Sequence, residues 1–185
     1  GTNLSDPIAD TEEDRLFALY ALELLDTKPE ETFDTLTDLA VGLTGARMSA
    51  ISLVDRDRQW FKSNINLPAE ETPRDVAFCH HAIEGDEIFY IPNALEDDRF
   101  KDNPLVTGEP NIRGYAGVPL REPGGHKIGT LCVIHDQPID LSESDLQRLT
   151  ALARVVEGRI AERAQSRARD ASTRQLAAIA QVQTH

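Results

Sequence analysis

The sequence lacks the long apolar runs of a membrane protein. No stretch of its 185 residues approaches the roughly 18 to 20 apolar residues that a helix needs to cross a bilayer, and no signal-peptide pattern opens it. Basic residues are also scarce: 19 Lys and Arg stand against 32 Asp and Glu, which gives a net charge of −13. A surface this acidic repels phosphates. We therefore expect a cytoplasmic protein that neither inserts into a membrane nor binds nucleic acid.

Cysteine is limited to Cys79 and Cys132, both in apolar surroundings. Such thiols usually pack as small hydrophobic groups, and a cytoplasmic chain disfavours a disulfide between them. Cys79 precedes His80 and His81, which are residue types of a zinc or iron site. Neighbouring helical residues point about 100° apart, so these two histidines cannot both face one cavity squarely. We therefore predict no metal site.

Known catalytic motifs are missing as well. The sequence contains no G-x-S-x-G, P-loop, GGDEF or H-E-x-x-H pattern. We therefore predict no catalytic residues and interpret the chain as a non-enzyme that binds and signals. An output domain of the kinase or cyclase kind would then be covalently linked to it.

The stretch from Ile112 to Ile134 carries the clearest structural signal of the sequence, that of a β-hairpin. Two apolar flanks, 112–120 and 128–134, carry no charged residue apart from Arg113. The polar insert between them contains Gly124 and Gly125, which can adopt the positive φ angles of a hairpin turn. Such flanks predict two strands in the middle of a sheet, covered on both faces. Pro119 has no N–H, so its end of the first strand should lie at an edge or a bulge.

The residues before this hairpin carry alternating helix and strand signals. Apolar spacing predicts helices at 12–25, 29–45 and 76–83 and strands at 48–54, 59–65 and 87–91. Segment 93–110 is a long polar loop with isolated apolar anchors, and loops of this length are usually functional. The order of elements predicts an α+β fold with an antiparallel sheet and helices on its faces.

Residues 141–185 predict one long C-terminal helix. Ser142 and Asp145 resemble a capping box, and apolar residues follow at coiled-coil spacing. A helix of about 40 residues would extend about 60 Å, well beyond a small domain. We consider its apolar seam and the Leu-rich face of 12–25 too extensive for one small domain to cover. This predicts a parallel homodimer through the terminal helices.

Four segments together resemble a GAF domain, a small-molecule-sensing relative of PAS domains. They are RQWFKS (58–63), TPRDVAFCHHAI (72–83), DDRFKDNPLVTGEPNIRGYAGVPL (97–120) and GHKIGTLCVIHDQP (125–138). Their order and spacing are similar to the subgroup found in bacterial sensor histidine kinases and cyclic-nucleotide signalling proteins. The resemblance covers roughly residues 12 to 165. It implies a central antiparallel sheet of five or six strands, terminal helices on one face and a ligand cavity on the other.

This resemblance divides the chain into a flexible lead (1–11), a sensory domain (12–140) and a helical or coiled-coil linker (141–185) to an output domain. A small molecule that the sequence does not identify would bind in the domain and bias the packing of the terminal helices. Four alternatives stay open: a dimerisation module that binds nothing, a redox- or metal-sensing module, a methionine sulfoxide reductase of the GAF type and a bilin-binding module. No cofactor can be named.

The candidate cavity lies beneath segment 93–110. We predict that it is lined by Phe78, His81, Phe100, Val106 and Tyr115. Arg74 and Arg113 are expected near it, because a guanidinium group binds carboxylate or phosphate, although Arg113 could equally pair with an acid. These residues favour a small, partly aromatic or anionic ligand over a lipid tail. Gly114 stands where the subgroup usually has an aromatic residue, which would enlarge the cavity.

Overall fold

The structure is a computed structural model that describes residues 11–183. Residues 1–10 of the predicted flexible lead therefore lie outside the described part of the chain. The first half contains α1 (Glu12–Ala21), α2 (Glu31–Thr44), β1 (Met48–Val54), β2 (Arg58–Ile65), β3 (Glu71–Pro73), the 3-10 helix η1 (Arg74–Val76) and α3 (Phe78–Ala82). The second half contains β4 (Phe89–Ile91), η2 (Ala94–Glu96), α4 (Pro104–Thr107), β5 (Gly114–Arg121), β6 (Lys127–His135) and α5 (Glu143–Gln183).

Six strands form one antiparallel sheet in the order β3-β2-β1-β6-β5-β4. The predicted α+β class and the central hairpin are thus confirmed, with β5 and β6 both inside the sheet. Gly125 adopts a φ of 92° in the hairpin turn. Pro119 lies beyond Gly117, the last residue of β5 that pairs with β4, and next to a register shift at Leu120/Arg121. Its missing N–H therefore falls where the sequence predicts.

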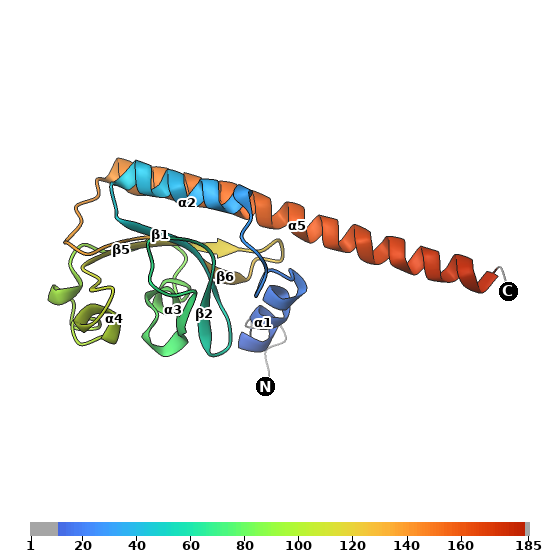
Figure 1. The fold of residues 1–185 in the computed structure, drawn as a ribbon, viewed down its shortest axis with the longest axis horizontal. Coiled ribbons are helices and arrows are strands. Elements are labelled where there is room, and N and C mark those ends of the chain that lie inside the picture. Colours follow the sequence, from blue (N-terminus) through green and yellow to red (C-terminus); the bar gives the residue numbers. More distant parts are fainter. Residues whose placement is uncertain (1–10, 184–185) are drawn as a thin grey trace, which may run out of the picture.

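Helices α2 and α5 pack side by side over one face of the sheet (Figure 1). The core beneath them is apolar and includes Leu36 and Ala40 of α2, and Leu149, Ala153, Val156 and Ile160 of α5. Leu16 and Leu19 of α1 belong to the same core. The predicted capping box of Ser142 and Asp145 forms at the start of α5, and Thr11 and Asp14 form a second one at the start of α1.

This packing corrects the reason given for a homodimer. Leu149 and Val156 are 0% exposed, and Leu16 and Leu19 of the first helix are equally buried. One domain therefore covers both apolar faces, because α1 packs against β6, and α5 packs against α2, β5 and β6. The homodimer itself stays a prediction and needs a different surface.

The packed part of α5 ends near Arg163. This side chain donates to the backbone carbonyls of Leu22 and Glu23 and pairs with Glu30 at 3.0 Å, where the helix leaves the domain. Beyond it the helix projects away from the sheet (Figure 1). In this projecting part Leu176 and Val182 are 68% and 77% exposed. The predicted long helix is therefore confirmed, although only its first half contributes to the core. Within residues 11–183 we find no helix that combines the length and the apolar character needed to cross a membrane.

Two local predictions need correction. The expected loop before residue 75 contains β3, which extends the sheet by pairing with β2. The glycine at position 114 does not enlarge the cavity, because a Cβ there would collide with the side chain of Ile139. Ile139 belongs to the helix-side core, so it fills the space that a larger residue would need.

Candidate ligand-binding pocket

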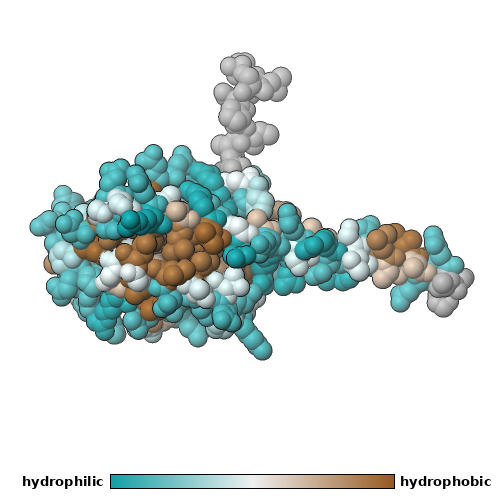
Figure 2. Space-filling model, turned by 90° about the horizontal axis from the view of Figure 1, so that it is seen from above, coloured by the Kyte–Doolittle hydropathy of each residue, from teal (hydrophilic) through white to brown (hydrophobic). Residues whose placement is uncertain are grey.

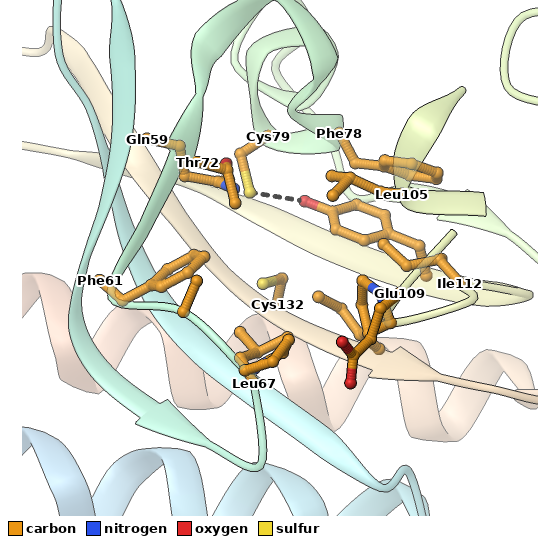
Figure 3. Close-up of a pocket in the computed structure, with 15 residues that line it drawn as sticks. Gln59, Phe61, Leu67, Thr72, Phe78, Cys79, Leu105, Glu109, Ile112 and Cys132 are labelled. Atoms are coloured by element: carbon orange, nitrogen blue, oxygen red, sulfur yellow. Dashed lines mark hydrogen bonds between the residues drawn. The ribbon is translucent and has the colours of Figure 1, made fainter. Parts of the chain in front are cut away.

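The second face of the sheet carries a cavity. It lies between the sheet, the β2–β3 connection, α3 and the segment around α4 (Figure 3). Alternate residues of a strand face the same side, so β2 contributes Gln59 and Phe61, and β6 contributes Cys132 and Ile134. The cavity measures about 90 Å³. Its walls are mostly apolar and include Phe61, Leu67, Phe78, Leu105, Ile112 and Ile134.

One polar atom of the wall is left without a partner. Gln59 is 5% exposed, and its side-chain nitrogen donates to Thr72 Oγ1 at 2.9 Å. Its side-chain oxygen, Oε1, is buried and accepts no hydrogen bond from residues 11–183. A buried carbonyl oxygen without a donor is costly, typically by about 1 to 3 kcal/mol. The pocket wall therefore contains a buried acceptor, which a ligand with an N–H or O–H group can satisfy once the Gln59 side chain turns toward it.

A cluster of hydroxyl groups surrounds Cys79 at the inner end of the pocket. Cys79 Sγ lies 3.0 Å from Ser52 Oγ, 3.1 Å from Thr130 Oγ1 and 3.1 Å from Tyr115 Oη. Gly117 makes this arrangement possible, because a Cβ at that position would overlap the hydroxyl end of the Tyr115 ring. The Cys79 and Cys132 side chains both border the cavity (Figure 3). As predicted, both cysteines are buried and unbridged.

The hydroxyl cluster favours a negative charge on one sulfur. Burial raises the pKa of the Cys79 thiol, but hydrogen bonds from the Cys132 thiol and the three hydroxyl groups outweigh burial and lower this pKa to about 7. The hydrogen bond with Cys79, followed by burial, raises the pKa of Cys132 well above its usual value. Burial, followed by the nearby Cys79 charge, raises the pKa of Tyr115. Tyr115 therefore stays protonated, and its hydroxyl group can donate a hydrogen bond to the Cys79 sulfur.

The predicted aromatic residues lie in one cluster, although not all of them line the cavity. Phe78 and Tyr115 are part of its wall. Phe100 and Val106 are fully buried, and the Phe100 ring stacks on the Phe78 ring with their centroids 4.2 Å apart. The His81 and Phe100 rings pack edge to face, with their centroids 4.9 Å apart. The structure therefore places Phe100, Val106 and His81 as support behind the cavity wall.

The two predicted arginines lie outside this cavity. Arg74 donates to the backbone carbonyl of Asp55 at 3.1 Å and to the ring of His80 at 3.1 Å. Arg113 donates to the backbone carbonyls of Val106 and Ile112, beside a separate polar surface depression. Both guanidinium groups therefore hold loop backbone in place, and neither reaches the apolar cavity.

Histidine side chains near the two cysteines in sequence do not converge on the thiols. His80 accepts a hydrogen bond from Arg74, and His135 accepts one from the backbone N–H of Arg47. Within residues 11–183 no three His, Cys, Asp or Glu side chains gather as a metal site would require. Cys79 and Cys132 therefore share a cavity with hydroxyl groups rather than with imidazoles.

Sequence reasoning missed the contribution of β2 and of the β2–β3 connection to the pocket. Gln59 and Phe61 are two residues apart in a strand, and this spacing was the available signal that they share a face. No signal identified that face as the pocket side, because both faces of β2 carry buried residues. Leu67 and Thr72 gave no local signal, since they lie in a segment of polar residues and prolines.

This fold and this pocket define a class of protein. A family model described as "GAF domain" matches residues 28–160. The match spans more than half of the chain, so the protein belongs to the GAF domain family, as its sequence motifs predicted. The GAF domain of an Acinetobacter phosphoenolpyruvate-protein phosphotransferase has the same fold, with a TM-score of 0.60 and 20% identity over 82% of this chain and 95% of that one.

Among individual proteins, the chain is similar to cyclic di-GMP phosphodiesterase PA2567 of Pseudomonas aeruginosa. The two are 39% identical over 155 residues, which are 83% of this chain and 26% of the relative. This chain thus spans about a quarter of the length of that relative. A free methionine-R-sulfoxide reductase from Neisseria meningitidis shares the fold, with a TM-score of 0.58 and 16% identity over 80% of this chain and 88% of that one.

These comparisons contradict the prediction of a non-enzyme, which is wrong. The 39% identical relative is named a phosphodiesterase, and the methionine-R-sulfoxide reductase of the same fold is also an enzyme. The prediction relied on the absence of short catalytic motifs. Such motifs describe residues that are close in sequence, whereas catalytic groups can be assembled from distant segments. Their absence therefore does not exclude an enzyme.

Proposed function

We propose that this chain is the sensory GAF module of a bacterial signal-transduction protein and that it binds a small, mostly apolar molecule in the pocket beside Gln59. The observation that carries the proposal is the buried Oε1 of Gln59, a residue of the cavity wall, which lacks a donor among the described residues. A ligand with one N–H or O–H group would satisfy this oxygen and remove its desolvation cost.

The size of the cavity narrows the chemistry of the ligand. Sites for drug-sized molecules measure roughly 300 to 1,000 Å³, and an apolar cavity of roughly 150 Å³ takes up benzene. A cavity of about 90 Å³ is smaller than either. It suits a ligand of a few heavy atoms, or a single ring once Tyr115 or the segment near Ile112 yields slightly. With Arg74 and Arg113 held elsewhere, we favour a neutral aromatic ligand over an anionic one.

The central strands offer a path from this pocket to the helices. Cys132 of β6 lines the pocket, whereas its neighbours Leu131 and Val133 point to the opposite face and pack in the helix-side core. A ligand that shifts β6 therefore changes the surface on which α2 and α5 rest. Such a ligand changes the signal only if it binds more tightly to one arrangement of the helices than to another.

The relative indicates where the signal goes. Because the similar Pseudomonas protein is a cyclic di-GMP phosphodiesterase, we propose that α5 connects this module to an output domain for cyclic di-GMP turnover. The pocket would then be a regulatory site, since a cyclic dinucleotide is far larger than a cavity of about 90 Å³.

Phenol and toluene provide a matched pair of probes, because they have the same shape and only phenol carries a donor. We expect phenol to raise the melting temperature of the protein more than toluene does. A ligand at 100 times its dissociation constant adds about 2.7 kcal/mol to the free energy of unfolding. Differential scanning fluorimetry across a concentration series measures both effects.

The variant Gln59→Leu is the control for this experiment. It keeps the volume of the side chain and removes the acceptor, so phenol should lose its advantage over toluene. If neither probe nor related small aromatics shift the melting temperature of the wild-type protein, the proposed ligand site is wrong. If phenol and toluene shift it equally, Gln59 does not select the ligand.

We also propose that two copies associate through the outer surface of the terminal helices. Figure 2 shows apolar residues gathered over the α2–α5 layer and again near the end of α5. Leu39 of α2 and Val155 of α5 are 51% and 45% exposed. Leu176, Ile179 and Val182 recur every three residues along the projecting helix and are also exposed. A second copy in parallel orientation would bring the same stripe against itself, as a two-fold interface requires.

A further inference from the structure

Two thiols on different elements border one cavity. Cys79 comes from α3 and Cys132 from β6, and both are unbridged. A buried thiol that serves packing alone behaves as a small hydrophobic group and needs no polar neighbours. Cys79 instead contacts the hydroxyl groups of Ser52, Thr130 and Tyr115 at 3.0 to 3.1 Å. This environment is a reason to consider chemistry at the sulfur.

The donors around Cys79 match a thiolate better than a thiol. A thiolate accepts hydrogen bonds and donates none, and it is the nucleophilic form of cysteine. Tyr115 keeps its proton, because burial and the nearby sulfur raise the pKa of the phenol. Ser52 Oγ donates to Cys79 Sγ, and the Tyr115 hydroxyl, 3.1 Å from the same sulfur, is a second donor when Cys79 is a thiolate. The same arrangement lowers the pKa of Cys79 to about 7 despite its burial.

Cys132 has the complementary property. The interaction with Cys79 and then burial raise the pKa of Cys132, so this residue stays protonated while Cys79 ionises. A protonated thiol beside a nucleophilic sulfur can close a disulfide and release its proton with the leaving group. The cavity that both residues border measures about 90 Å³, and on this measure one water needs only about 10 to 15 Å³. A small hydroperoxide therefore fits in the pocket, although Cys79 and Cys132 are only 2% and 0% exposed.

We propose that Cys79 and Cys132 are a hydroperoxide-sensitive thiol pair, in which Cys79 is oxidised first and Cys132 closes an intramolecular disulfide. The Cys79 thiolate attacks a peroxide oxygen, so an S–O bond forms and the O–O bond breaks. The leaving oxygen takes up a proton and departs as an alcohol or water. The sulfur of Cys132 then attacks Cys79, so an S–S bond forms, the S–O bond breaks and water leaves. Two thiols are oxidised by two electrons and one hydroperoxide is reduced.

The disulfide would join α3 to the central strand β6 across the floor of the pocket. It would also convert the sulfur that the Tyr115 hydroxyl contacts into an uncharged disulfide sulfur, and so weaken this contact and change the pocket wall. This redox step does not depend on ligand binding and goes beyond the proposed sensory function.

The first test uses the unaltered protein. The reduced chain is treated with hydrogen peroxide at pH 7, alkylated under denaturing conditions and digested for mass spectrometry. We expect one crosslink between the Cys79 and Cys132 peptides, with a loss of two hydrogen atoms, and its reversal by dithiothreitol. The crosslink should form intramolecularly at the same rate over a tenfold range of protein concentration.

Two variants separate the roles of the sulfur atoms. Cys132→Ser should stop at a sulfenic acid on Cys79, which dimedone traps, whereas Cys79→Ser should leave Cys132 reduced. Tyr115→Phe removes one donor and keeps the ring. We expect the pH midpoint of the oxidation rate to rise by about one unit in this variant, and the rate at pH 7 to fall up to roughly tenfold.

Three results would overturn the proposal. One is a wild-type chain that keeps both thiols reduced while glutathione in the same solution is oxidised. Another is a wild-type chain that accumulates sulfenic acid without the crosslink. The third is an oxidation rate that follows the pH profile of free glutathione and does not change in Tyr115→Phe. Circular dichroism of each variant establishes that it is folded before the rates are compared.

Discussion

The two faces of the sheet satisfy their polar groups in different ways. On the helix face, the buried hydroxyls of Thr37 and Ser63 lie 2.8 Å apart, and Ser63 donates to Asp34 at 2.6 Å. Lys62 is 3% exposed and donates to Thr27 and to the carbonyl of Lys28. On the pocket face, a cavity remains, Gln59 Oε1 has no partner among residues 11–183 and two thiols stay unbridged.

This difference assigns the faces different roles. A layer of closely packed apolar side chains has low compressibility and transmits displacements, as the core beneath α2 and α5 must do if it relays a signal. A layer with a cavity and an unsatisfied acceptor can change its free energy when a ligand enters. The strands between the layers belong to both, because successive side chains of β6 face opposite sides. Four predictions test this division, from the largest expected effect to the smallest.

Truncation of Leu149 should break the helix face. Leu149 is 0% exposed in the helix-side core, so Leu149→Ala leaves a cavity and should lower the free energy of unfolding by about 2 to 5 kcal/mol. Urea denaturation measures this. The matched control is Leu176→Ala on the same helix, where the side chain is 68% exposed and the change should stay within about 0.5 kcal/mol. Equal effects at both positions would show that the first half of α5 does not belong to the core.

Overpacking at Gly117 should disturb the pocket face. A Cβ at this position would collide with the Tyr115 hydroxyl, so Gly117→Ala must displace the ring and should cost about 1 to 3 kcal/mol. It should also slow the oxidation of Cys79, because the displaced phenol no longer donates to the sulfur. Gly42→Ala in α2 is the matched control: its Cβ would meet open space, and alanine favours a helix by about 1 kcal/mol. If Gly42→Ala lowered the free energy of unfolding, the space around a glycine Cβ position would not predict the effect of an alanine there.

Acid should weaken an ion pair that links α1 to the pocket side. Glu12 pairs with Arg15 of its own helix and with Arg74 of η1. The Arg15 hydrogen bond, against opposing burial and with help from Arg74, lowers the pKa of Glu12 to about 2. A lowered pKa stabilises the folded state above the unfolded pKa, and this contribution is lost as the pH falls toward 2.

The variant Glu12→Gln isolates this contribution. Because the Glu12 side chain is 44% exposed, we expect a loss of only about 0.5 to 1 kcal/mol at pH 7 and a much smaller loss at pH 2, where the carboxyl group is partly protonated. Urea midpoints measured from pH 7 to pH 2 in both proteins supply the comparison. A constant difference across this range would mean that Glu12 does not titrate as its surroundings indicate.

Charges on the outer surface of the helices should change association and leave the fold intact. Leu39→Glu combined with Val155→Glu alters two half-exposed side chains, so monomer stability should change by only about 0.5 kcal/mol per site. Light scattering should then show a dimeric wild-type protein and a monomeric double variant. A monomeric wild-type protein at micromolar concentration would contradict the proposed homodimer.

Much of the fold could be predicted from local patterns. The short apolar run 48–54 and the charge-free flanks around Gly125 identify strands without reference to partners, and the confirmed capping box at Ser142 marks where the last helix begins. Four motifs in order were specific enough for the GAF family. These features depend on residues close in sequence, where hydrogen bonding and hydrophobic period are the deciding factors.

The partners of each surface could not be predicted in this way. The spacing of Leu149 and Val156 indicates an apolar stripe and does not say whether a sheet or a second chain covers it. The sheet covers it, because α5 packs beside α2 on β5 and β6. Likewise, Cys79 and Thr130 are 51 residues apart, and only the approach of α3 to β6 brings the sulfur within 3.1 Å of the hydroxyl group.

The sequence by itself therefore determined the long helices, five of the six strands, their order and the family to which the protein belongs. The tertiary structure alone decided which face of the sheet is packed, which one holds the cavity, and that Gln59, Cys79, Tyr115 and Cys132 meet there. The physical reason is range. Helix and strand propensities act between near neighbours, whereas an unsatisfied carbonyl oxygen or a stabilised thiolate depends on atoms that distant segments bring within about 3 Å.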